Sequence, residues 1–272
     1  MFFRSLFVVS CAVSCVSSVA SAQSVGSQVV GYTNPAESTF NNSSVVLGMP
    51  ERSHAGTDVT VFSPTFGADT IVRIQPGGSL ALKLSAPVQV NASRTLGVIS
   101  NIGLIDASED GSGVVASSAP FTFSNAPVAN VSVSSDGTTY FPVSGGLISF
   151  TMPATGFTNS PAWTNYSPTG GSTPADFFKP TPTSVQDGGV ASFAGMTYAQ
   201  TVAALQGSGG GTWLSLGSTG LSSVNYVKFD VPSDAPAGSR FILDAVVGVS
   251  APEPASLGAM VIGLIALTRR VR

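Results

Sequence analysis

Apolar residues recur at every second position in several short segments of this chain. In 80–84, three leucines on one side alternate with Ala81 and Lys83 on the other. This two-residue period is typical of β-strands that bury one face. The same alternation occurs at 72–75, 148–152 and 226–231. The segment 241–249 is almost continuously apolar, which predicts a central strand covered on both faces.

Turn-forming residues separate these segments. Gln75-Pro76-Gly77-Gly78 predicts a chain reversal, and Asp136-Gly137 within 131–141 predicts a hairpin with a tight two-residue turn. One short helix is predicted at 197–205, with Thr197 as its N-cap. Only 9% of the residues are charged, against about 25% in a typical soluble domain, which excludes a helix bundle. We therefore expect an all-β fold, a β-sandwich or jelly roll with one short helix.

The N-terminal segment has the pattern of a secretory signal peptide. Arg4 supplies a positive charge, and 6–19 is an apolar run broken only by small residues. Ala20 and Ala22 then provide the small side chains that signal peptidase accepts, so we expect cleavage before Gln23. Both cysteines of the chain lie inside 1–22. The mature protein would therefore contain no thiol and no disulfide.

The C-terminal segment 250–272 combines three features in a fixed order. Pro252-Glu253-Pro254 comes first, the uncharged run 255–268 follows, and then three arginines, Arg269, Arg270 and Arg272. The uncharged run is shorter than the ~20 residues that span a bilayer comfortably. The arginines are expected to stay on the cytoplasmic side and stop transfer there. A retained but marginal membrane anchor and a removable signal are the two alternatives.

This C-terminal pattern resembles the PEP-CTERM sorting signal of Gram-negative bacteria that make exopolysaccharide. The resemblance implies that an exosortase, a membrane-embedded cysteine transpeptidase or protease, recognises Pro252, Glu253 and Pro254. It further implies export across the inner membrane, transient anchoring by the C-terminal helix, and release to the cell surface or extracellular matrix.

The body, 23–249, carries a second resemblance. Four of its segments resemble, in the same order, a group of uncharacterised PEP-CTERM surface proteins with a jelly-roll, discoidin-like body; these are 192–200, 207–212, 216–229 and 242–246. The resemblance implies fold and export, and it attaches no activity. We expect one domain in this region, because no charged or low-complexity linker divides it.

Few residues of the mature chain could support catalysis. His54 is the single histidine, it lacks a Gly-x-Ser-x-Gly partner motif, and its polar surroundings predict a solvated loop residue. The carboxylates could supply a glycosidase pair, although no spacing selects one. The glycine-rich segment 207–212 lacks the lysine of a phosphate loop and predicts a flexible turn. A net charge of −3 leaves no basic surface for a nucleic acid.

One acidic cluster and one isolated aspartate are candidate cation sites. Asp106, Ser108 and Asp110 place oxygen atoms at alternate positions before a glycine, which is a weak calcium pattern because Ser117 stands where a bidentate glutamate is needed. A solvated acidic turn is the preferred interpretation. Asp244 lies in an apolar strand, where an unpaired carboxylate is costly. We expect it to accept hydrogen bonds from the backbone or from Lys or Arg, or less favourably to bind a cation, and we expect no cofactor.

Aromatic residues are spread through the segment 159–189, and its many prolines predict a long loop on the surface. Its aromatics, Trp163, Tyr166, Phe177 and Phe178, are expected first of all to pin this segment to the sandwich. The alternative is that loop aromatics such as Trp163, Tyr166 and Trp213 stack on sugar rings, whose axial C–H surface is apolar.

Three functions remain open at this stage. The first is a non-catalytic, exported cell-surface or matrix protein associated with exopolysaccharide. The second is a carbohydrate-binding module that uses loop aromatics. The third is a secreted glycoside hydrolase that uses two carboxylates.

Overall fold

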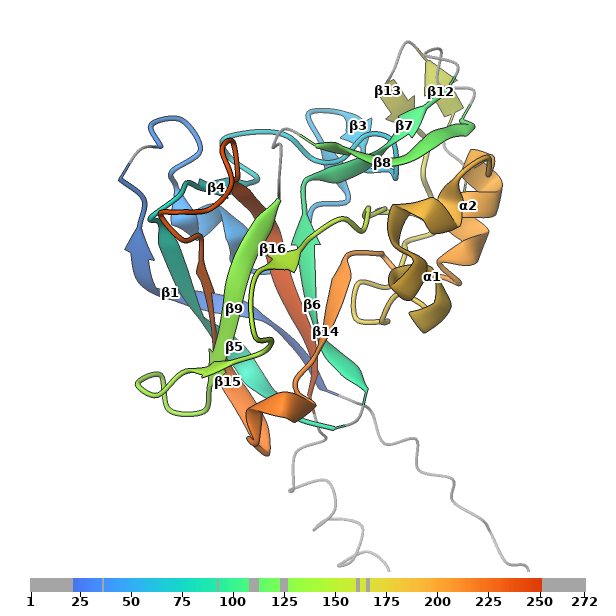
Figure 1. Cartoon of the computed structure of the whole chain (residues 1–272). Coiled ribbons are helices and arrows are strands. Elements are labelled where there is room, and N and C mark those ends of the chain that lie inside the picture. The colour runs from blue at the N-terminus through green and yellow to red at the C-terminus, as the bar shows by residue number, and fades with distance from the viewer. Residues whose placement is uncertain are drawn as a thin grey trace, which may run out of the picture. The chain divides into compact units, whose positions relative to one another are not determined.

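The computed structural model describes residues 22–35, 37–91, 93–107, 113–122, 127–159, 162–164 and 167–250. This part of the chain is mostly β, and its main element is a curled antiparallel sheet (Figure 1). The strands of that sheet are β1 (Ala22–Thr33), β4 (Val72–Ile74), β5 (Ser79–Gln89), β6 (Arg94–Ser100), β9 (Val128–Ser134), β10 (Phe141–Pro142), β11 (Ile148–Ser149), β14 (Thr212–Ser215), β15 (Ser223–Asp230) and β16 (Phe241–Ser250).

Smaller elements complete the unit. The short strand pairs are β2 (Ser53–His54) with β3 (Thr57–Asp58), β7 (Ile102–Asp106) with β8 (Val115–Thr122), and β12 (Ala162–Thr164) with β13 (Ser167–Thr169). The α-helices are α1 (Thr183–Gly188) and α2 (Tyr198–Ala204). The 3-10 helices are η1 (Ser43–Val46), η2 (Gly189–Phe193) and η3 (Gly217–Thr219).

The main sheet has the strand order β10-β9-β15-β5-β1-β16-β6-β14. It curls because strands near both ends of this order bury side chains in one hydrophobic core. Val131 and Val133 enter that core from β9, and Leu96 and Val98 enter it from β6. The Ser218 hydroxyl beyond β14 also donates to the Val143 carbonyl beyond β10, at 2.9 Å.

The prediction of a doubly covered central strand is confirmed by β16. Its residues from Phe241 to Gly248 are all buried. Phe241 and Leu243 face the main core, whereas Val247 packs on the other face against Ile99 and Trp213. β16 pairs along its length with β1, β4 and β6.

The alternation in β5 is confirmed, because its three leucines are buried and Lys83 is exposed. The prediction for 148–152 is wrong in extent: the strand ends at Ser149, although Phe150 and Met152 beyond it are buried. The hairpin 131–141 forms, but its tight turn does not. Val133 pairs with Phe141, so the connection is a longer loop.

Asp136 closes that loop through its side chain. Its carboxylate accepts the backbone N–H groups of Thr138 and Thr139 at 2.8 and 2.9 Å, and the Ser134 hydroxyl at 2.9 Å. Asp side chains commonly hold turns in this way. The competing local hydrogen bonds explain why the Asp-Gly pair does not form a two-residue turn here.

The helices and the β7–β8 ribbon lie beside the main sheet (Figure 1). A second hydrophobic cluster holds them together. Leu104 from β7, Val115 from β8, Val185 from α1, Phe193 from η2 and Leu205 beyond α2 all enter it. Helix α2 confirms the predicted helix, with Thr197 as its N-cap in a capping box with Gln200. Helix α1 was not predicted, because its six residues show too little apolar periodicity.

Candidate functional site

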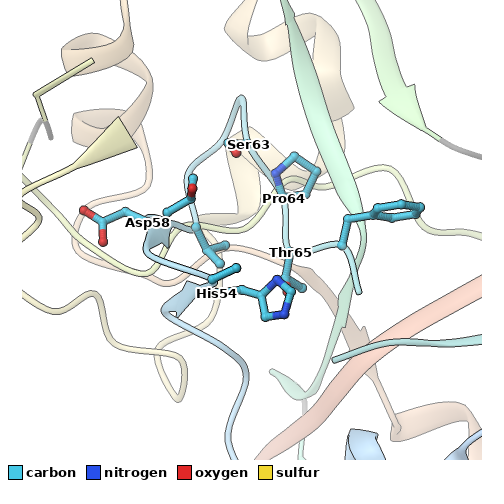
Figure 2. Close-up of a pocket in the computed structure, with 9 residues that line it drawn as sticks. His54, Asp58, Ser63, Pro64 and Thr65 are labelled. Carbon is cyan, nitrogen blue, oxygen red and sulfur yellow. The ribbon is translucent and has the colours of Figure 1, made fainter. Parts of the chain in front are cut away.

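A cavity of about 320 Å³ opens beside the β2–β3 hairpin (Figure 2). Its lining residues are His54, Ala55, Thr57, Asp58, Val59, Ser63, Pro64, Thr65 and Phe66. The hairpin supplies the first four, and the chain that follows it supplies the rest. All of the lining residues therefore come from one continuous stretch of the chain, 54–66.

His54 forms an ion pair or hydrogen bond with a residue outside that hairpin. Its Nε2 atom lies 3.2 Å from Asp69 Oδ1, and its side chain is 26% exposed. The hydrogen bond from His54 lowers the pKa of Asp69 below its ordinary value. Gly67 makes room for the pair, because a Cβ there would lie 2.4 Å from Asp69 Oδ1 and 2.7 Å from His54 Cε1. The prediction of a solvated loop histidine is wrong in part: His54 lies in the two-residue strand β2 and has a carboxylate partner, although its side chain is partly exposed.

Asp58 has a structural role in this cavity. Its Oδ1 accepts the Ser53 hydroxyl at 2.8 Å, and its Oδ2 accepts the Gly171 backbone N–H at 2.7 Å. Figure 2 shows its carboxylate pointing away from His54, Ser63 and Thr65. Asp58 thus connects the hairpin to the segment after β13, and it does not face His54 as a second catalytic acid would.

Phe66 forms an apolar part of the cavity rim. It is 42% exposed, and its ring centre lies 5.2 Å from that of Phe40, with the two ring planes tilted by 45°. The guanidinium of Arg73 lies 4.3 Å from the centre of the Phe40 ring and also pairs with Glu37. Phe66 was not predicted as a site residue, because nothing in the sequence around it distinguishes it from a buried aromatic residue.

A second cavity, of about 610 Å³, lies near β14. Its lining residues are Ser93, Arg94, Pro180, Thr181, Pro182, Thr183 and Ser215. Arg94 pairs with Asp187 of α1. Gln186 fixes α1 to the sheet, because its side chain accepts from the Trp213 N–H at 2.9 Å and donates to the Trp213 carbonyl at 2.5 Å. Neither this cavity nor the one beside His54 is lined by two carboxylates.

Asp244 lies in a β-bulge at the centre of the sheet. Leu243 pairs with Ser100 and Ala245 with Ile99, so Asp244 is the extra residue of β16. Burial raises its pKa well above the ordinary value, and the nearby Glu51 carboxylate raises it further, whereas the hydrogen bond from the Glu51 backbone N–H opposes this. The prediction that Asp244 accepts a backbone hydrogen bond is confirmed.

Of the three predicted glycan-contacting aromatics, the structure describes the side chain of Trp213. Trp213 is 1% exposed and its indole N–H donates to the Gly210 carbonyl at 3.1 Å, so the prediction of a sugar contact there is wrong. β14 carries this side chain into the packed interior between Ile99 and Phe177. The backbone of Trp163 lies in β12 and its side chain is outside the described residues, as is Tyr166.

Phe177 pins the segment 159–189, as predicted. It is 1% exposed and packs against Trp213, and Arg52 lies 4.7 Å from its ring centre. The expectation that this whole segment lies on the surface is wrong, because Ala175 and Thr181 are buried as well. Because the Phe177 ring packs in the interior, neighbouring residues of the chain such as Ala175 and Thr181 are buried with it.

The glycine-rich segment 207–212 joins α2 to β14, but it is packed and largely buried. A Cβ on Gly209 would lie 2.2 Å from the Phe177 ring, and one on Gly210 would lie 2.2 Å from the Pro153 carbonyl oxygen. The prediction of a flexible turn is therefore wrong: the backbone of this segment packs closely against the Phe177 ring and the Pro153 carbonyl. Glycine allows it because it has no side chain.

The proposed calcium residues are described only in part. Asp106 ends β7, and its Oδ2 accepts the Gly113 backbone N–H at 3.4 Å; Ser108 and Asp110 lie outside the described residues. Within the part of the chain that the structure describes, no group of three or more His, Cys, Asp or Glu side chains could hold a metal ion.

The terminal signals lie almost wholly outside the described residues. These include Ala20, the Pro252-Glu253-Pro254 motif and the three terminal arginines. Ala22 and Gln23, at the predicted signal peptidase site, are the first two residues of β1. Among the helices that the structure describes, none is long and apolar enough to cross a membrane.

Comparison with known proteins gives no relative on which to base a function. No family model matches the chain, and neither a curated protein nor a solved structure matches it.

Proposed function

We propose that this chain is a non-catalytic, exported protein of the cell surface or extracellular matrix, delivered by its signal peptide and sorted through its PEP-CTERM tail. The observation that carries the proposal is the position of the folded body between the two signals. β1 begins at Ala22 and β16 ends at Ser250. Cleavage before Gln23 and near Pro252 would remove only Ala22 from the sheet.

The pairing of the terminal strands supports this proposal. Ala22 is the partner of Ser250, and Gln23 is the partner of Val249. The two predicted cleavage sites therefore lie at the same end of one strand pair: the first falls between Ala22 and Gln23, and the second lies beyond Ser250. Cleavage removes the Ala22–Ser250 pair, and the pairing from Gln23 with Val249 onwards remains.

The finer fold that we propose is a β-sandwich of the jelly-roll, discoidin-like type. The curled antiparallel sheet and its enclosed core support this proposal, because a jelly roll also closes strands around one core. The two cavities described above are each lined by at most one carboxylate, which disfavours a glycosidase pair at either of them.

Carbohydrate binding is a second candidate function, and one observation favours it. Phe66 is half-exposed at the rim of a cavity that also presents the His54 imidazole and the Ser63 hydroxyl. Sugar sites combine an aromatic face with polar groups in this way.

The sorting proposal is tested by replacing Pro252, Glu253 and Pro254 with alanine in the native host. We expect the precursor to accumulate in the inner membrane fraction, because the exosortase would lose its recognition motif. The matched control replaces Asp234 and Pro236, an acidic residue and a proline on an exposed loop of the body. The control should be released normally, and normal release of the motif variant would contradict the proposal.

A further inference from the structure

The cavity beside His54 has the size of a site for one small ligand. Its volume of about 320 Å³ lies at the lower end of the range of ligand pockets, about 300–1,000 Å³. One sugar residue fits such a volume, whereas an oligosaccharide would extend beyond it. The cavity is also open to solvent at its rim, where Phe66 is 42% exposed.

The lining is divided between apolar and polar groups. Pro64 and Phe66 are apolar residues of the lining, and Thr57, Ser63 and His54 supply hydroxyl and imidazole groups. Figure 2 shows His54 and Ser63 on opposite sides of the labelled set, with Pro64 and Thr65 beside them. A pyranose ring has an apolar C–H face and hydroxyl groups at its edge, so it matches both kinds of wall.

The charges around the cavity select against an acidic sugar. None of its lining residues is Lys or Arg. The Asp69 carboxylate lies beside His54, is paired with it, and has its side chain 77% exposed. A uronic acid would meet this like charge with no lysine or arginine in the lining to offset it, which is unfavourable.

We propose that this cavity binds one neutral sugar residue of an extracellular polysaccharide, with Phe66 against the ring face and His54 and Ser63 bonded to hydroxyl groups. The proposal rests on the proposed function, because it names the partner with which the exported protein associates. The aromatic contact with the sugar is then made by Phe66 and not, as predicted from the sequence, by Trp213, which is buried.

The single histidine makes the site directly observable. Because the chain has one His, proton NMR of the purified protein gives one imidazole Cε1–H signal, and that signal belongs to the cavity. We would titrate with the methyl glycosides of glucose, galactose, mannose and N-acetylglucosamine, each to about 50 mM, because so small a ligand binds in the millimolar range. At least one should shift the His54 signal in a saturable manner, and glucuronate should not.

Phe66→Ala should weaken the binding about tenfold, because it removes the aromatic face. Phe66→Leu keeps the apolar volume and should weaken binding by a similar factor, which guards against a folding defect in the alanine variant. The matched control is Phe141→Ala on β10, a residue of similar exposure, 37%, that does not line the cavity. This control should bind as the unaltered protein does.

The proposal is overturned if none of the four glycosides shifts the His54 signal, if both Phe66 variants bind normally, or if glucuronate alone binds. These outcomes leave the export proposal untouched, because that proposal is measured by cell fractionation. Failure of sorting in cells would in turn leave the NMR result valid for the purified protein.

Discussion

At the scale of single residues, Asp244 illustrates how the sheet keeps a carboxyl group in its interior. The side chain is 3% exposed, and the bulge in β16 places it close to Glu51. An isolated carboxylate there would be costly, so the raised pKa favours the protonated form. A protonated carboxyl retains one oxygen that accepts the Glu51 backbone N–H.

Asp244→Asn should change how stability depends on pH. Because the pKa of Asp244 is higher in the folded than in the unfolded protein, the folded state binds this proton more tightly, and its contribution is complete below the ordinary value of 3.8. The free energy of unfolding then falls as pH rises towards the raised pKa, by at most about 1.4 kcal/mol per pH unit.

The asparagine variant has no such proton, so its stability relative to the unaltered protein should rise with pH above 3.8. Urea unfolding across a pH series measures this difference, and Asp234→Asn on an exposed loop is the control. Parallel curves for the unaltered protein and Asp244→Asn would show that burial leaves the carboxyl pKa unchanged.

Gly210→Ala should destabilise the protein by about 2 kcal/mol or more. Gly210 has a φ of +82°, and an added Cβ would lie 2.2 Å from the Pro153 carbonyl oxygen, so the variant adds backbone strain and a backbone clash. Gly145→Ala is the matched control, since nothing lies within 4 Å of a Cβ there. Thermal unfolding compares the two variants, and equal melting temperatures would refute the close approach.

Residue-level predictions succeeded where the cause is local. The apolar neighbours of Asp244 correctly indicated a buried, backbone-bonded carboxylate. His54 was placed wrongly because its partner Asp69 is 15 residues away, and Trp213 because β14 carries it into packing with Phe177. Pairings between distant residues have no signature in the sequence around either member.

At the scale of elements, the N-terminus of α2 is fixed by two reciprocal side-chain bonds. Gln200 Oε1 accepts the Thr197 N–H at 2.8 Å, and Thr197 Oγ1 accepts the Gln200 N–H at 3.3 Å. The Thr197 cap was predicted from the sequence, whereas the reciprocal bond with Gln200 was not. By contrast, the loop after β9 was predicted too short, because several side-chain bonds to Asp136 compete with the tight turn.

Thr197→Ala should lower the free energy of unfolding by about 1 kcal/mol, because the variant loses the cap of α2. Thr183→Ala is the control: it lies exposed at the start of α1, whose N-terminus has no side-chain cap, so it should change stability by less than about 0.5 kcal/mol. Chemical denaturation measures both, and equal effects would contradict the capping assignment.

At the scale of the whole molecule, the strand pattern predicted a mostly β, antiparallel fold. The order of strands and the curl of the sheet could not be predicted in this way. β5 pairs with both β1 and β15, and β9 pairs with β15 from far along the chain. Alternation shows which face of a strand is buried, but it does not select the neighbour.

Removal of both terminal signals during export is central to the proposed function. The most direct test is the intact mass of the protein recovered from the surface or medium of its native cells. We expect a chain that begins at Gln23 and ends within a few residues of Pro252. A stable product that retains the three terminal arginines would contradict the claim.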